Sequence, residues 1–174
     1  MKHAMRVLAS IIAITALSGC SATSGLQPDI SQSGFDGARV VSIQGHGNAC
    51  SKMVCTGLGA QWKSSSPSVA ILVVYTFNDI SAITGAKLNV DGKIYELTAI
   101  DVLTNFNEPS AAIQESRKGF LVPLELIRKI TTSHKTWLRV QTHDGYIEDA
   151  VIDGGTESKA YNALKRFILA VDQA

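Results

Sequence analysis

The sequence has few charged residues and almost no imbalance between the two signs. Charged side chains make up 18% of the 174 residues, and 16 Lys and Arg stand against 15 Asp and Glu. A net charge of +1 produces no field of the kind that nucleic acids recognise, so we expect no nucleic-acid partner. Cysteine is also scarce, with three residues, which excludes a disulfide-dense scaffold. The length suits one domain rather than two.

Motifs for the common catalytic sites are absent as well. The chain contains no Gly-x-Ser-x-Gly, no Ser-x-x-Lys, no His-Glu-x-x-His and no phosphate-binding glycine loop. His134 follows Ser133 and His143 precedes Asp144, but both histidines stand in expected loops, where solvated polar residues are usual. We therefore assign no catalytic residues and expect no cofactor.

The first twenty residues have the organisation of an export signal. Lys2 and Arg6 precede an uncharged run over residues 7–17, which is too short to span a bilayer. Leu17-Ser18-Gly19-Cys20 follows at once. This order of basic start, apolar run, two small residues and cysteine resembles the lipobox of bacterial lipoprotein precursors.

The resemblance implies a lipid anchor. Residues 1–19 would be the signal peptide, and Cys20 would become the first mature residue, carrying a diacylglyceryl thioether and a fatty acid such as palmitate on its amino group. Several acyl chains hold a protein firmly on a membrane. In this family an aspartate after the cysteine favours the inner membrane, so Ser21 implies the periplasmic face of the outer membrane.

The mature chain divides into a tether and one domain. Residues 20–34 are rich in serine and glycine with scattered apolar residues, which is typical of a flexible linker. No repeat and no second linker follow, so residues 35–174 are expected to form a single globular domain.

The domain has the pattern of a β-rich protein. Residues 69–77 are apolar almost throughout and β-branched at several positions, which predicts a central strand covered on both faces. Asp91-Gly92 predicts a two-residue turn between strands at 82–90 and 93–100, with Lys87 opposite Glu96. Further strands are expected at 39–43, 59–64 and 118–122.

A second hairpin is predicted around residues 143–145. We expect a three-residue loop that places Asp149 opposite Arg139, whereas a two-residue loop would place it opposite Val140. Asp144, Glu148, Asp149 and Asp153 are then expected to lie on a solvated strand face.

Helices are predicted at 123–131, starting with Pro123, and at about 157–172, capped by Thr156. The expected fold is α+β and β-rich: an antiparallel sheet or sandwich of about seven or eight strands, with the C-terminal helix packed on it.

Cys50 and Cys55 are the two cysteines left after lipidation. Outside the cytoplasm such a pair usually forms a disulfide. His46 adds an alternative, because His-x3-Cys-x4-Cys offers three soft ligands for copper or zinc, or two thiols for redox chemistry. A fourth ligand is not evident nearby.

Two functions are compatible with these observations. The first is a non-catalytic accessory lipoprotein that binds an envelope protein or a glycan. The second is an envelope metal-binding or redox protein that uses His46, Cys50 and Cys55. The lack of catalytic motifs favours the first function.

The anchor is directly testable. Replacing Cys20 by alanine removes the thiol that would accept the diacylglyceryl group, so Cys20→Ala is expected to abolish lipidation. Metabolic labelling with a fatty-acid analogue measures this, with Cys50→Ala as the matched control. Label retained by the Cys20 variant would contradict the assignment.

Overall fold

The computed structural model describes residues 26–101, 105–106 and 114–174, and within them the chain forms two antiparallel sheets and two helices. The signal peptide, Cys20 and Ser21 lie outside the described residues. The expected α+β, β-rich fold is confirmed, with more strands than predicted. No helix in the described ranges is long and apolar enough to cross a membrane.

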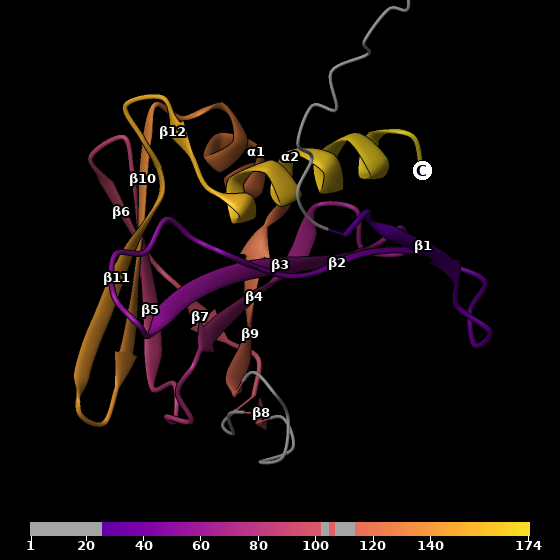
Figure 1. Cartoon of the computed structure of the whole chain (residues 1–174). Coiled ribbons are helices and arrows are strands. Elements are labelled where there is room, and N and C mark those ends of the chain that lie inside the picture. Colours follow the sequence, from indigo (N-terminus) through magenta and orange to yellow (C-terminus); the bar gives the residue numbers. More distant parts are fainter. Residues whose placement is uncertain (1–25, 102–104, 107–113) are drawn as a thin grey trace, which may run out of the picture.

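The larger sheet, sheet A, lies across the middle of the molecule (Figure 1). Its strand order is β1-β2-β3-β4-β9-β7, and β8 also pairs with β9. The strands are β1 (Asp29–Gln32), β2 (Arg39–Gly47), β3 (Cys55–Lys63), β4 (Val69–Phe77), β7 (Thr98–Ala99), β8 (Asn105–Phe106) and β9 (Glu115–Pro123).

The smaller sheet, sheet B, stands beside sheet A with the strand order β12-β11-β10-β5-β6 (Figure 1). Its strands are β5 (Gly85–Val90), β6 (Lys93–Glu96), β10 (Lys135–Thr142), β11 (Gly145–Asp153) and β12 (Thr156–Glu157). Asp91 and Gly92 have positive φ values of 47° and 89°, as expected for this turn. The predicted pairing of Lys87 with Glu96 is confirmed.

Two helices close the open side of the core. Helix α1 (Leu124–Thr132) follows β9, with Pro123 just before its first residue, and α2 (Lys159–Asp172) ends the chain. The cap of α2 is Ser158 and not the predicted Thr156, because Thr156 belongs to β12. The Ser158 side chain accepts a hydrogen bond from the Tyr161 backbone N–H at 3.0 Å.

The helices cover one face of sheet A, which we call its inner face. Helix α2 packs on β2 and β3, and the Tyr161 hydroxyl donates to the Thr131 carbonyl of α1 at 2.9 Å. The core is enclosed by this inner face, sheet B and the helices, and its largest fully buried side chains include Phe120, Phe167 and Leu72. The opposite side of sheet A, its outer face, has no helix on it in the described residues (Figure 1).

Part of the range expected to be a flexible tether is a strand. Within the range 20–34, residues 29–32 form β1 and pair in register with β2, from Asp29 opposite Ser42 to Gln32 opposite Arg39. The serine-rich composition suggested a linker, but a strand at a sheet edge needs only backbone hydrogen bonds and tolerates polar side chains.

The packing of α2 can be tested by truncating one buried and one exposed side chain of this helix to alanine. Phe167 is fully buried, so Phe167→Ala is expected to lower the free energy of unfolding by about 3–5 kcal/mol. Leu169 is 60% exposed, and Leu169→Ala is expected to change it by less than about 1 kcal/mol. Urea unfolding measures both values. Equal losses would show that α2 is not anchored through Phe167.

Candidate functional site

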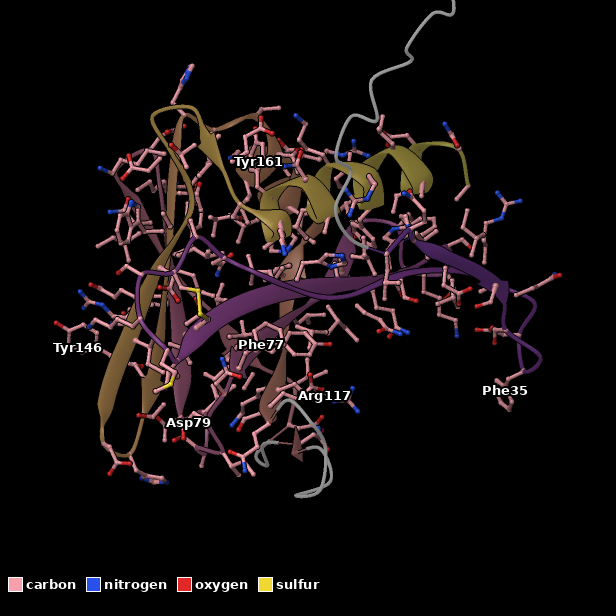
Figure 2. All side chains as sticks on the ribbon, viewed as in Figure 1. Phe35, Phe77, Asp79, Arg117, Tyr146 and Tyr161 are labelled. Atoms are coloured by element: carbon pink, nitrogen blue, oxygen red, sulfur yellow. A yellow bond between two sulfur atoms is a disulfide. The ribbon has the colours of Figure 1, made fainter. Side chains whose placement is uncertain are left out.

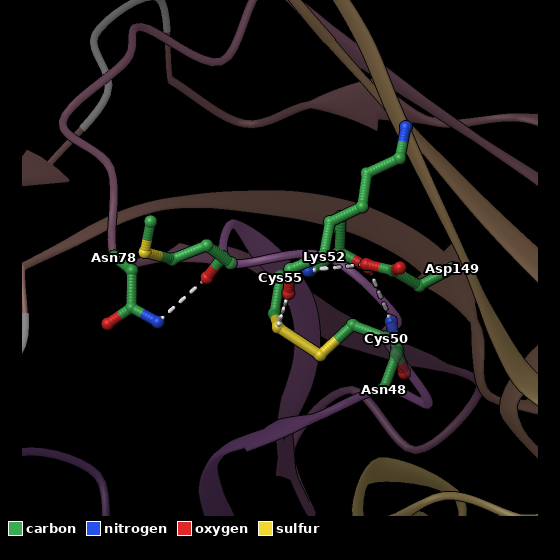
Figure 3. Close-up of a disulfide and its surroundings, with 8 residues drawn as sticks. Asn48, Cys50, Lys52, Cys55, Asn78 and Asp149 are labelled. Carbon is green, nitrogen blue, oxygen red and sulfur yellow. Dashed lines mark hydrogen bonds between the residues drawn. A yellow bond between two sulfur atoms is a disulfide. The ribbon is translucent and has the colours of Figure 1, made fainter.

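The loop between β2 and β3 joins the two sheets. Cys50 and Cys55 form the predicted disulfide, with their Cα atoms 5.5 Å apart (Figure 3). Asn78, at a φ of 62°, donates its side-chain amide to the Met53 carbonyl at 2.9 Å and so holds the loop from β4. Ala49 pairs with Ala150 of β11, and the Ala49 backbone N–H donates to the Ala150 carbonyl at 2.9 Å.

A buried polar chain lies beside the disulfide (Figure 3). One carboxylate oxygen of Asp149 accepts from both the Thr56 backbone N–H at 2.7 Å and the Thr56 hydroxyl at 2.8 Å. The Asn48 side-chain amide donates to the Thr56 hydroxyl oxygen at 2.9 Å. All three residues are buried, and Thr56 has no exposed surface, so a substrate cannot reach its hydroxyl. The cluster can join β3 to β11 but cannot act as a nucleophile and base.

The position of Asp149 corrects the predicted hairpin. Thr142 pairs with Gly145, which leaves a two-residue turn and places Asp149 opposite Leu138, on the inner side of sheet B. Both predicted partners, Arg139 and Val140, were wrong. Glu148 is the residue opposite Arg139, and the two side chains form an ion pair. A shift of one residue moves every side chain of a strand to the other face, which turned an expected surface carboxylate into a buried one.

His46 does not join the cysteines as a metal ligand. Its Nδ1 lies 2.8 Å from the Gln44 carbonyl oxygen and its Nε2 accepts from the Leu26 backbone N–H at 3.0 Å, so both ring nitrogens are occupied. Burial is the main cause that lowers the pKa of His46, which keeps the ring neutral. The two sulfur atoms are bonded to each other. Across the described ranges no group of three or more His, Cys, Asp and Glu residues could hold a metal ion.

The outer face of sheet A is the most unusual surface of the molecule. Strand β4 is central in the sheet, as predicted, and its inward residues Ala70, Leu72 and Val74 are buried. Its outward residues Val69, Ile71 and Val73 are half-buried, which differs from the expected cover on both faces. Cover on this side would require another layer of structure, and the described residues supply none.

Neighbouring strands extend this apolar surface. Leu121 lies directly opposite Ile71 and is 50% exposed, and Ile100, which lies over Gly119, is 44% exposed. Together with Val40 of β2 these side chains form a strip, which we call the apolar strip: Val40, Val69, Ile71, Val73, Ile100 and Leu121. Its end near β1 contains a groove of about 410 Å³, lined by the strip residues Val40, Ile71 and Leu121 and by Gln61, Lys63 and Ser66.

Two aromatic rings lie flat at the other end of the strip. Tyr75 and Phe77 stack with their centroids 5.6 Å apart, and Figure 2 shows Phe77 and Arg117 on the side of sheet A away from α2. A Cβ atom at Gly45 would be 2.7 Å from the Tyr75 ring, and one at Gly57 would collide with Phe77. Glycine is therefore required at both positions, and its use keeps this end of the face flat.

The outer face of sheet B has a different chemistry. A groove of about 310 Å³ lies around Trp137 and Ile94. The charges beside it are paired with each other, Lys87 with Glu96, Arg139 with Glu148 and Lys135 with Asp153. The Trp137 indole N–H donates to Asp153 at 3.0 Å. The charged and polar side chains of this face thus pair with one another, as is usual for a solvated sheet surface.

The junction between the sheets provides a testable consequence. Asp149→Ala would leave two buried donors of Thr56 without an acceptor, so the free energy of unfolding is expected to fall by about 3 kcal/mol. The neighbouring change Glu148→Ala breaks only an exposed ion pair and is expected to cost less than about 1 kcal/mol. Urea unfolding compares the two variants. A larger loss for Glu148→Ala would show that the junction does not carry this stability.

Comparisons with known proteins add no information on function. No protein-family model, no curated protein and no solved structure matches this chain. The arrangement of the chain's own residues is therefore the basis for a functional conclusion, and the apolar strip on the outer face of sheet A is the candidate site.

Proposed function

We propose that this protein is a lipid-anchored lipoprotein of the cell envelope whose domain is a non-catalytic binding module for another envelope protein. Lipid on Cys20 would hold it at the membrane, and Ser21 favours the periplasmic face of the outer membrane. The partner protein would cover the apolar strip. The resemblance of residues 1–20 to lipoprotein precursors supports the anchor, and the exposure of the strip supports the binding role.

The observation that carries the binding role is the unequal burial of β4. The strand is apolar at nearly every position, yet one of its faces has only partial cover in the described residues. Burial of apolar surface stabilises by about 25 cal/mol per Å², so covering this face with a second apolar surface is energetically favourable. Contiguous exposed apolar surface bordered by polar residues is typical of protein interaction sites.

The shape of the strip favours a protein over a glycan. Sugar-binding surfaces offer exposed aromatic faces next to hydrogen-bonding side chains, whereas Tyr75 is buried and its ring packs against Gly45. Aliphatic side chains dominate the strip, and the groove at its end has room for a large apolar side chain of a partner. Such a pocket is where interface anchor residues usually insert.

The alternative function gains no support from the geometry. A metal carrier or redox protein would need accessible thiols or free imidazole nitrogens. Instead, Cys50 and Cys55 form a disulfide beside a buried junction, and His46 binds the backbone on both sides of its ring. These contacts support structural roles for all three residues.

Site-specific photo-crosslinking in the native host tests the binding face. A photoreactive amino acid at Leu121 is expected to yield a covalent adduct with a partner protein. The matched control is the same amino acid at Ile94, which is 64% exposed on the outer face of sheet B and should yield no such adduct. Ile71→Lys should reduce the Leu121 adduct several-fold because it places a charge beside it.

The stability of the Ile71→Lys variant must be checked by urea unfolding, and a loss below about 1 kcal/mol is expected because the side chain faces outward. Equal adducts from Leu121 and Ile94 would contradict a binding role for the strip. An adduct of twice the chain's mass would instead identify a second copy of this chain as the partner.

A further inference from the structure

Hydrogen bonds hold Leu26, the first residue that the structure describes, to the folded domain. The Leu26 backbone N–H donates to Nε2 of His46 at 3.0 Å, and the Leu26 carbonyl accepts from the Arg166 guanidinium of α2 at 3.2 Å. Both polar groups of this residue are thus held by side chains of the folded domain. Any lipid on Cys20 therefore connects to the domain through α2 and β2, and not through a freely swivelling linker of fifteen residues.

Only six residue steps separate Cys20 from Leu26. A fully extended chain spans at most about 3.6 Å per residue, so Leu26 lies within about 22 Å of the lipidated residue. A domain of this size has a diameter of about 35–40 Å. The surface around Leu26 must therefore stay near the bilayer, and the opposite end of the domain cannot turn to face it.

We propose that the exposed side of α2 faces the membrane and contacts the phosphate groups of anionic lipids. The proposal rests on the lipid anchor of the proposed function and adds the orientation of the domain and a second interaction surface. This surface, which we call the basic face, consists of Lys159, Lys165, Arg166 and Leu169 of α2 together with Leu26.

The charges of the basic face fit an anionic surface. Lys159, Lys165 and Arg166 lie on one side of α2, and the acid on that side, Asp172, is paired with Arg128 of α1. Lys165 is 3.5 Å from Glu157, whereas Lys159 has no ion pair within the described ranges. Basic residues held near an anionic leaflet attract it electrostatically over about a Debye length.

The Arg166 guanidinium serves the attachment of Leu26 and not the lipid contact. One of its terminal nitrogens donates to the Leu26 carbonyl, and its Nε and other terminal nitrogen are buried, so a lipid phosphate does not reach them. The cations that can reach a phosphate are the exposed ammonium groups of Lys159 and Lys165. Leu26 and Leu169 are exposed on the same surface, and apolar side chains next to cations are typical of helices that rest on a bilayer surface.

The orientation also agrees with the proposed binding face. Helix α2 covers the inner face of sheet A, so the outer face with the apolar strip is turned away from α2 (Figure 1). With the basic face on the membrane, the apolar strip points into the periplasm. A partner protein would reach it without passing the bilayer.

Photo-crosslinking to lipid tests this orientation with a matched pair of positions. The full mature protein, with its lipid verified by mass, is reconstituted in phosphatidylethanolamine vesicles with or without phosphatidylglycerol. A photoreactive amino acid replaces either Leu169, 60% exposed on α2, or Tyr146, 61% exposed on the β10–β11 hairpin far from α2 (Figure 2). We expect lipid adducts at Leu169 at least about fivefold above those at Tyr146, increasing with phosphatidylglycerol.

Charge variants separate the phosphate contact from mere proximity. The double change Lys159→Gln and Lys165→Gln, which leaves the Arg166 contact with Leu26 intact, should lower the Leu169 adduct about fivefold or more in phosphatidylglycerol vesicles. The control double change Lys93→Gln and Lys135→Gln removes the same charge from sheet B and should leave the adduct unchanged. Circular dichroism and urea unfolding verify that all variants fold.

Equal adducts at Leu169 and Tyr146 would overturn the orientation, and an effect of the control pair equal to that of the α2 pair would overturn the headgroup contact. A Leu169 adduct independent of phosphatidylglycerol would also overturn the contact. Absence of lipid on Cys20 in the starting protein is a separate result, because it contradicts the anchor before any vesicle is added.

Discussion

The hydrogen bonds between Asp149 and Thr56 connect the two halves of the fold. A carboxylate taken out of water is costly unless it is hydrogen-bonded, and here one of its oxygens accepts a backbone N–H and a hydroxyl from the same residue of β3. The pair joins the middle of β11 to the start of β3 and so places sheet B beside sheet A. The core depends on this placement, because its buried side chains come from both sheets and from the helices.

The disulfide and the junction act on the same short loop. Cys50 and Cys55 close the segment that follows Asn48, while Asn48 and Thr56 hold its two ends by a backbone hydrogen bond of 2.9 Å. A crosslink of this kind stabilises mainly by limiting the unfolded chain, and a short loop gives a modest effect. The cysteines thus contribute to the architecture of this loop, whereas His46 holds the N-terminal segment through the Leu26 N–H.

The fold separates two surfaces with different chemistry. Helix α2 covers the inner face of sheet A and presents cations on its other side, while the outer face of the same sheet presents aliphatic side chains. A sheet one layer thick therefore places a charged surface and an apolar surface on opposite sides of the domain. For a protein held by a short chain segment at Leu26, this arrangement would direct one surface to the bilayer and the other to the surrounding compartment.

Features that depend on neighbouring residues were predictable from the sequence. The Asp91-Gly92 turn determines its hairpin register locally, the nine-residue run at Val69–Phe77 is too β-branched for a helix, and the apolar stripe of α2 needs only helical periodicity. The disulfide followed from having two cysteines close in sequence. The candidate site was less predictable, because the run at 69–77 indicates an apolar strand but does not show that one of its faces lacks cover.

The remaining features arise from contacts between segments far apart in the chain. Sequence pattern placed Asp149 on a solvated face, but its burial depends on a one-residue shift at Thr142 and on Thr56, 93 residues away. Leu26 is held by His46 and Arg166, and a serine-rich stretch contains no signal for such partners. The sequence by itself thus determined which segments become strands, helices and turns, because those depend on local periodicity and turn chemistry. Only the tertiary structure decided which faces are buried, because burial depends on what other elements pack against them.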